Sequence, residues 1–171
     1  MVEPGILHVA AEGDREIVIT RAFHARRTLL FDAHTKPELV RRWLGIHAGW
    51  AMVVCEIDLR PEGMYRYLWH KELDGKTVYL GMIGIYREVT PPVRTVASEL
   101  FDDPWYPGEC LVTMSLSEKD SLTELALSLS YETPEARDLV LRTPVHVGLR
   151  ESYDALDRVL DEAQSGSEKS I

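Results

Sequence analysis

Aromatic side chains at alternate positions are the first feature of this sequence that suggests chemistry. Tyr65, Tyr67 and Trp69 alternate along one predicted strand, so the three side chains point to the same face of a sheet. On a concave face their rings and polar tips line a pocket for a flat or amphipathic ligand. On another face they are core packing or an outward aromatic row, and the alternation leaves these alternatives open.

Glu99 is a candidate for acid–base chemistry. It lies between Ala97 and Phe101 on one face of a predicted strand. A carboxyl group that faces a dry cavity has a raised pKa and can act as an acid or a base. The plainer interpretation is a solvated or ion-paired strand residue, so Glu99 is a candidate only and no catalytic residue is assigned.

Further candidate binding residues lie on predicted helices. Trp43, near the end of a short helix, is either a gatekeeper of the pocket or plain core. His146 and Arg150 are four residues apart on the last helix, where they could receive an anionic head group or form a surface pair. Leu149 and Tyr153 belong to the apolar stripe of that helix and are expected to face the pocket.

The elements that position these residues are a sheet and a long C-terminal helix. A strand over 15–23 precedes two short helices, over 25–33 and up to Leu44, and Thr35 with Glu38 fits a capping box for the second. About six short strands follow up to Tyr131, and most are joined by hairpin signals such as Asp74-Gly75. A strand beginning at Ala51 is expected to place Val53, Cys55, Ile57 and Leu59 on one face.

The C-terminal region carries two helix-start signals. Thr133-Pro134 suits an N-cap followed by the first helical position, and Thr143-Pro144 repeats the pattern, which predicts a break near Pro144. Beyond it an apolar stripe runs to Leu160 at helical spacing.

These elements predict an α+β fold, in which a curved antiparallel sheet of about six to seven strands wraps around the long helix. We expect a single domain over 15–163, because 171 residues with 45% hydrophobic composition can bury one sizeable core. Residues 1–14 are expected to form a tail or an added edge strand, and 164–171 a disordered tail.

Composition excludes several classes of function. The net charge of −9, from 28 acidic and 19 basic residues, disfavours nucleic acid as a partner. No apolar run is long enough to span a membrane, and Cys55 and Cys110 lack metal-type spacing, so we expect a cytoplasmic protein with free thiols. The six histidines show no metal-binding spacing and no glycine-rich phosphate loop is present, so neither a metal nor a cofactor is predicted.

Several segments together resemble one known family, the bacterial "activator of Hsp90 ATPase homologue 1-like" proteins of the START/Bet v 1-like superfamily. In order and at family spacing, they are Glu16 to Arg21, Lys36 to Val40 with Arg42 and Trp43, Asp58 to Arg60, Gly84 to Val89 with Pro91 and Pro92, and Glu135 to Asp138 followed by Ser152 to Asp154. The resemblance implies a helix-grip fold with a cavity between the long helix and the sheet, and it places Trp43 at the cavity mouth.

The sequence departs from the family pattern at two places. His24-Ala25-Arg26 stands where relatives commonly carry a small acidic residue and a proline. Thr143-Pro144 replaces a common Gly-Met ahead of the last helix, a change that touches the cavity roof. Relatives are therefore an unsafe guide to the ligand of this chain.

Three classes of function remain, because this superfamily hosts carriers, receptors, cyclases and co-chaperones on one scaffold. The first is a module that binds a small hydrophobic or aromatic molecule, the second a partner of an Hsp90-like chaperone. The third is an enzyme of the cyclase or aromatase type acting on a polyketide-like substrate, with Glu99 or a tyrosine as its base. The outer face of the sheet and the Trp105-Tyr106 loop could also support a homodimer.

Overall fold

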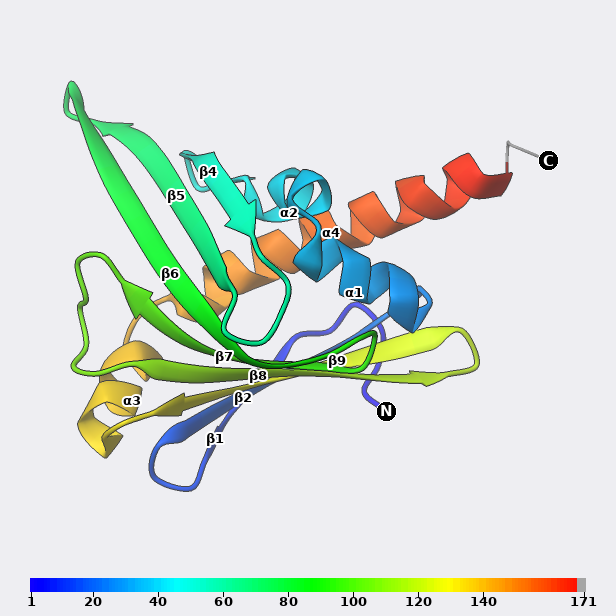
Figure 1. Ribbon diagram of the computed structural model, residues 1–171, viewed down its shortest axis with the longest axis horizontal. Helices are drawn as coiled ribbons and strands as arrows, with labels where there is room; N and C mark the ends of the chain where they lie inside the picture. The colour runs from blue at the N-terminus through cyan, green and yellow to red at the C-terminus, as the bar shows by residue number, and fades with distance from the viewer. Residues whose placement is uncertain (169–171) are drawn as a thin grey trace.

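The computed structural model describes residues 1–168, apart from the side chains of residues 46, 47, 145, 146 and 168. The described residues form nine strands and four helices (Figure 1). The strands are β1 (His8–Glu12), β2 (Glu16–Phe23), β3 (Ile46–His47), β4 (Trp50–Ile57), β5 (Met64–Leu73), β6 (Lys76–Thr90), β7 (Arg94–Phe101), β8 (Cys110–Lys119) and β9 (Leu122–Tyr131). The helices are α1 (Arg27–Thr35), α2 (Pro37–Leu44), α3 (Pro134–Leu141) and α4 (Val145–Glu168).

All the strands join one antiparallel sheet in the order β1-β2-β9-β8-β7-β6-β5-β4-β3. The predicted α+β helix-grip architecture is confirmed, although nine strands exceed the expected six to seven because β1 and the two-residue β3 extend the two edges. Of the two alternatives for residues 1–14, residues 8–12 form the edge strand. Asp74 and Gly75 both have positive φ angles, 50° and 74°, as the hairpin signal requires.

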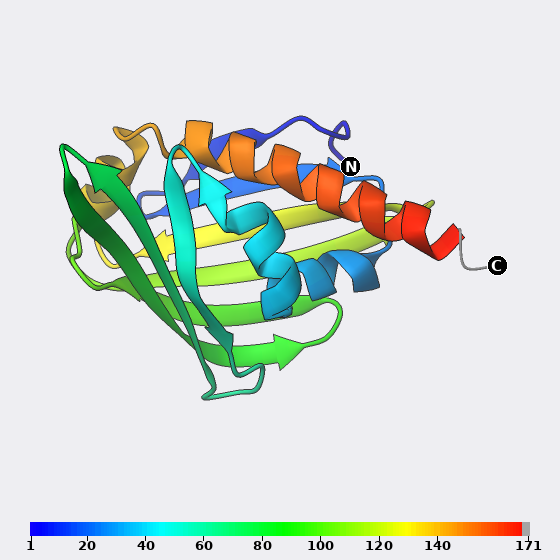
Figure 2. The same cartoon turned by 90° about the horizontal axis from the view of Figure 1, so that it is seen from above.

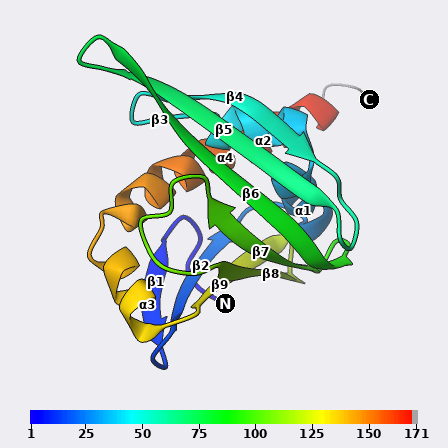
Figure 3. The same cartoon turned by 60° about the vertical axis from the view of Figure 1, so that its left-hand side comes forward.

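The sheet curves over the helices. Strands β7, β8, β9 and β2 lie as one layer, while β4, β5 and β6 curl away from it toward α4 (Figures 1 and 3). Helix α4 crosses the concave side, with α1 and α2 beside it (Figure 2). Register shifts in β4, between Met52 and Val54, and in β6, between Tyr86 and Glu88, add local twist at the curled end.

The shift in β4 corrects one expectation. Val53 was expected on the same face as Cys55 and Ile57, but its side chain is 45% exposed. Val53 is the extra residue at the irregularity, and an extra residue turns the side chains before it to the opposite face.

The capping box predicted for α2 is wrong. Helix α1 continues through Thr35, so the Thr35 hydroxyl donates to the Phe31 carbonyl, 2.8 Å away, inside α1. Lys36 takes the N-cap position of α2 without a side-chain cap, and Pro37 occupies the first turn. A threonine in a helix interior commonly bonds back to the carbonyl four residues earlier, which removes its hydroxyl from capping.

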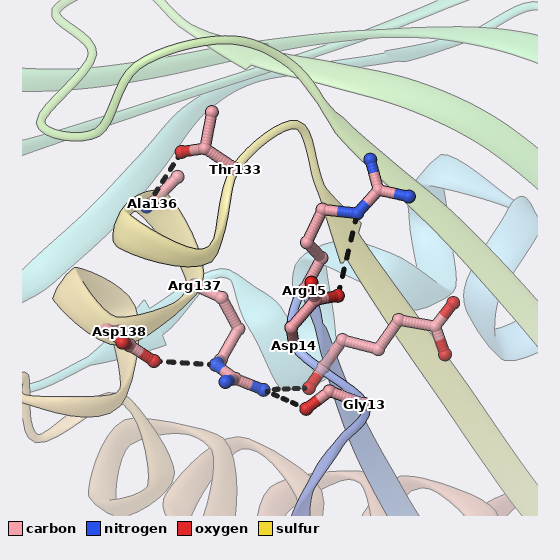
Figure 4. Close-up of polar contacts among 8 residues, drawn as sticks. Gly13, Asp14, Arg15, Thr133, Ala136, Arg137 and Asp138 are labelled. Carbon is pink, nitrogen blue, oxygen red and sulfur yellow. Dashed lines mark hydrogen bonds and ion pairs between the residues drawn. The ribbon is translucent and has the colours of Figure 1, made fainter.

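The cap of α3 and the break after it are both confirmed. The Ala136 amide donates to the Thr133 hydroxyl at 3.1 Å, and the chain leaves helical geometry between Leu141 and Val145, at Pro144. Arg137 then joins α3 to the first hairpin. Its guanidinium donates to Asp138 and to the carbonyls of Gly13 and Glu16 (Figure 4).

Helix α4 extends to Glu168, so residues 164–168 of the expected tail are helical. The Gln164 amide donates to the carbonyls of Leu160 and His24, which ties this last part of the helix to the loop after β2. Residues 169–171 of that tail lie outside the described range.

An ion pair fastens α4 to the sheet. Arg21 interrupts the apolar face of β2 and is only 1% exposed. Its guanidinium donates to Asp154, at 2.8 Å, and to Asp157, both on α4. The guanidinium also lies 5.4 Å from the centre of the Phe23 ring. This contact fixes where the helix lies over the sheet.

Two features of the structure bear on the predictions of free thiols and of no membrane span. Cys55 and Cys110 are both buried and unbridged, in agreement with free thiols. Within the described residues, no helix combines the length and apolar character needed to cross a membrane.

Candidate functional site

A cavity of about 300 Å³ lies between the concave face of the sheet and the helices. Its walls come from the inward positions of β2 and β5 to β9, and from the inner sides of the four helices. The tip of the loop between β7 and β8 contributes Trp105 and Tyr106. The volume is at the lower end of the roughly 300–1,000 Å³ that ligand pockets span.

Tyrosines gather at the curled end of the cavity. The ring of Tyr65 lies 5.2 Å from that of Tyr67 on the same strand and 5.1 Å from that of Tyr86 on β6, measured between ring centroids. Burial is the main cause that raises the pKa of each of these phenols, so all three stay protonated at neutral pH. All three line the cavity, whose walls are mainly apolar.

Glu99 faces these tyrosines from β7. The Tyr65 hydroxyl donates a hydrogen bond to the Glu99 carboxylate. Burial raises the pKa of Glu99 from 4.5 to about 6, and the hydrogen bond from Tyr65 acts in the opposite direction. Glu99 keeps part of its surface accessible, and it lines the cavity.

Gly84 makes room for this pair. It lies directly opposite Tyr65 in the β5–β6 ladder, and the Tyr65 ring rests on the Gly84 backbone. A Cβ atom at this position would lie 2.0 Å from Cζ of Tyr65, well inside van der Waals contact. The glycine is therefore needed for the close approach of the ring.

Trp43 and Tyr153 form the helical wall of the cavity. Their rings stack with centroids 5.8 Å apart, and the Trp43 indole Nε1 donates to the Ala33 carbonyl at 2.8 Å. The His34 ring lies 4.9 Å from that of Trp43. Burial lowers the pKa of His34 to about 4, so its imidazole is neutral at physiological pH.

Tyr106, Tyr131 and Cys110 lie at the end of the cavity near the β7–β8 loop. Tyr106 packs edge-on against Tyr131, with 5.2 Å between ring centroids, while the neighbouring Trp105 is 41% exposed. Burial raises the pKa of the Cys110 thiol to about 12, so the thiol is protonated and a poor nucleophile at neutral pH. Of the two aromatic residues of the expected dimer loop, Trp105 is exposed and Tyr106 is buried, and the homodimer stays a prediction.

The structure brings together six of the nine residues predicted as binding candidates. Those that line the cavity are Trp43, Tyr65, Tyr67, Glu99, Leu149 and Tyr153. Trp69 is buried beside it, where its Nε1 donates to the Leu44 carbonyl at 2.9 Å. Arg150 is exposed on α4, and the side chain of its expected partner His146 lies outside the described part of the chain.

Other lining residues were missed. Tyr86 on β6, Thr95 on β7, Met114 on β8 and Tyr131 on β9 all face the cavity. Each belongs to a period-two pattern on its strand, as Tyr65 does, so the alternation carried the signal. Which face of each strand is concave was the missing information.

The described residues of the cavity wall offer one carboxyl group, Glu99, and several phenols as polar groups. No cluster of three or more metal-ligating side chains is found among the described residues. Glu99 with a pKa of about 6 can hold or release a proton near neutral pH, and Tyr65 can donate to it. The linear sequence did not reveal this pairing.

The family model described as "Activator of Hsp90 ATPase homolog 1-like protein" matches residues 24–161. A crystal structure of a protein from Rhodobacter sphaeroides is 33% identical, with a TM-score of 0.82, and the match covers 91% of this chain and 98% of that one. Among curated proteins, none matches this chain.

More distant structures share the fold alone. CalU16 from Micromonospora echinospora is 23% identical with a TM-score of 0.59, over 96% of this chain and 90% of that one. An Hsp90 activator from Plasmodium falciparum is 23% identical with a TM-score of 0.51, over 68% of this chain and 72% of that one. The family model covers most of the chain, including the elements that line the cavity other than β2. The chain therefore belongs to the activator of Hsp90 ATPase homolog 1-like family.

Proposed function

We propose that this protein binds a small, largely apolar aromatic molecule in the cavity between the sheet and helix α4. The observation that carries the proposal is the cavity itself, about 300 Å³ of space enclosed mainly by aliphatic and aromatic side chains. A concave, mainly apolar pocket of this size with a few polar groups is typical of small-molecule binding sites. Polar groups at Glu99 and Tyr65 supply orientation.

A cavity-filling variant tests this proposal. Ala97 is buried on the inner face of β7 and lines the cavity, so Ala97→Phe places a ring in the ligand space. Leu100 is 38% exposed on the other face of the same strand, so Leu100→Phe adds an aromatic group outside the cavity. The probe is the neutral fluorophore N-phenyl-1-naphthylamine, whose emission rises in apolar surroundings.

Saturable, one-site enhancement is expected for the wild-type protein and for Leu100→Phe, and little or none for Ala97→Phe. Equal enhancement by the wild type and Ala97→Phe would place the dye elsewhere and contradict the proposal. Circular dichroism of each variant checks that the fold is retained. Native mass spectrometry of the protein from its own host, followed by extraction, then identifies the natural ligand.

A second candidate function is binding to an Hsp90-type chaperone, which the family match over residues 24–161 favours. A chaperone would bind the outside of the protein, so chaperone binding should not change when Ala97→Phe fills the cavity. Stimulation of the ATPase of a purified Hsp90 homologue by the wild type and by Ala97→Phe alike is the expected result. The absence of both stimulation and a complex on a sizing column would remove this candidate.

A further inference from the structure

The described residues that line the cavity include one acidic side chain, Glu99, and no lysine or arginine. His34 also lines the cavity, but burial keeps its imidazole neutral. Any net charge inside the cavity at neutral pH therefore comes from Glu99.

Glu99 has no cationic partner within the described part of the chain. The Tyr65 hydroxyl is the group that donates to it, and its carboxylate takes part in none of the ion pairs found among these residues. Because its pKa is about 6, most molecules carry an ionised Glu99 near pH 7.5. An ionised carboxylate in apolar surroundings is costly unless a cation compensates it.

Another buried charge of this chain, Arg21, has carboxylate partners, although its Nε and Nη1 atoms have no hydrogen-bond partner among the described residues. Arg21 is only 1% exposed, and its guanidinium meets two carboxylates on α4. A structural role for Glu99 would be expected to come with a comparable partner. Glu99 has no such ionic partner among the described residues, which favours a role in ligand binding over a structural role.

Tyrosine rings cluster beside Glu99. Tyr65 and Tyr86 lie close together next to the carboxylate, and Tyr67 continues the cluster along β5. The face of an aromatic ring is negative and attracts ammonium groups. Carboxylate and rings therefore favour the same kind of ligand.

We infer that the ligand of this cavity is a small aromatic amine, whose ammonium group pairs with Glu99 while its apolar body fills the space toward Trp43 and Tyr153. This assignment rests on the proposed function and adds the charge of the ligand to it. An anionic ligand such as a fatty acid meets a like charge at Glu99 and no cation on the wall.

Three probes of matched shape test the charge of the ligand: tryptamine, neutral 3-ethylindole and anionic indole-3-propionate. Calorimetry near pH 7.5 should show tryptamine binding about tenfold or more tightly than 3-ethylindole, and indole-3-propionate binding most weakly. Tryptamine that binds no more tightly than 3-ethylindole overturns the inference. If the preference for tryptamine is absent but 3-ethylindole or the naphthylamine dye still binds, the proposed function stands and only the inference fails. If neither the three indoles nor the dye binds, both fail.

Glu99→Gln separates the charge from the shape of the site. The variant should lose the preference for tryptamine but keep its affinity for 3-ethylindole. Asp103→Asn is the matched control, because it removes one exposed negative charge from the β7–β8 loop without touching the pair. A tryptamine preference that survives Glu99→Gln, or that falls equally in Asp103→Asn, overturns the assignment to Glu99.

The pH dependence gives an independent readout. Between about pH 7.5 and 5 the amine stays protonated while Glu99 takes up a proton, so the tryptamine preference should fall through the pKa of about 6. The other titratable groups facing Glu99 do not titrate in this window, because burial raises the pKa values of the surrounding phenols and thiol and lowers that of His34 to about 4. The phenols are those of Tyr65, Tyr67, Tyr86, Tyr106 and Tyr131, and the thiol is that of Cys110. A preference that stays constant across the window contradicts the pairing.

Discussion

The indole of Trp43 on α2 stacks on the phenol ring of Tyr153 on α4, with the two ring planes 27° apart. The same indole donates to the Ala33 carbonyl in α1. One side chain thus joins three helices along the wall of the cavity. Its contribution should be visible in stability as well as in ligand binding.

Trp43→Phe is expected to lower the free energy of unfolding by roughly 1–3 kcal/mol. The variant loses indole volume and leaves the buried Ala33 carbonyl without this donor. Urea denaturation followed by circular dichroism measures the change. Trp50→Phe, at a half-buried position on β4, is the control and should change stability by less than about 0.5 kcal/mol. Equal losses in the two variants would contradict the bridging role of Trp43.

Glu99→Gln should make the protein more stable above pH 6. Because the pKa of Glu99 is raised from 4.5 to about 6 on folding, the native state binds this proton more tightly than the unfolded state. Glu99 therefore supports the fold below pH 4.5, and that support is lost as the pH rises through 6.

At pH 8 the Gln variant should exceed the wild type by about 2 kcal/mol, since each pKa unit corresponds to about 1.4 kcal/mol. Near pH 4, where Glu99 is mostly protonated in both the folded and the unfolded state, the two proteins should unfold with about the same free energy. Unfolding in urea at a series of pH values measures the difference. A Gln variant that is less stable than the wild type at pH 8 would mean that the ionised carboxylate is compensated in the native state.

Gly84→Ala should disrupt the Tyr65–Glu99 pair. The added methyl group would lie 2.0 Å from Cζ of Tyr65, so the ring must move and its bond to Glu99 is strained or lost. We expect a loss of stability of about 1–3 kcal/mol, from overpacking, together with weaker binding of the naphthylamine dye.

Gly148→Ala is the matched control for this substitution. No heavy atom lies within 4 Å of a Cβ atom at Gly148, in the first turn of α4. Alanine there should raise stability by up to about 1 kcal/mol through its helix propensity. A Gly84→Ala protein that retains full stability and dye binding would argue against the close packing of Tyr65 on β6.

Arg21→Ala should be the most destabilising single charge removal in this group of variants. The buried guanidinium joins β2 to Asp154 and Asp157, and removal of one partner of a buried ion pair costs about 3–5 kcal/mol. Both carboxylates keep some access to water, which places the expectation near the lower end of that range, about 3 kcal/mol.

Arg26→Ala provides the comparison, because Arg26 pairs with Glu118 while its own side chain is 71% exposed. Its loss should cost less than about 1 kcal/mol. Thermal unfolding of the two variants side by side measures the difference. Similar small effects in both would show that Arg21 does not hold α4 on the sheet.

The elements of this protein could be predicted largely from local patterns. Period-two alternation predicted the strands, Thr133-Pro134 the start of α3, and Thr143-Pro144 the break before α4. Each of these signals arises from neighbouring residues, through side-chain direction and backbone hydrogen bonding, and so is present in the linear chain.

Only the tertiary structure decided how those elements enclose a site. Alternation placed Tyr65 and Tyr67 on one face but could not say that the face is concave, or that it meets Glu99 across β6. The register shift that turned Val53 outward and the close approach at Gly84 likewise depend on the partner strand. Curvature, register and the burial that raises the pKa of Glu99 are products of contacts between distant segments, and no local pattern specifies them.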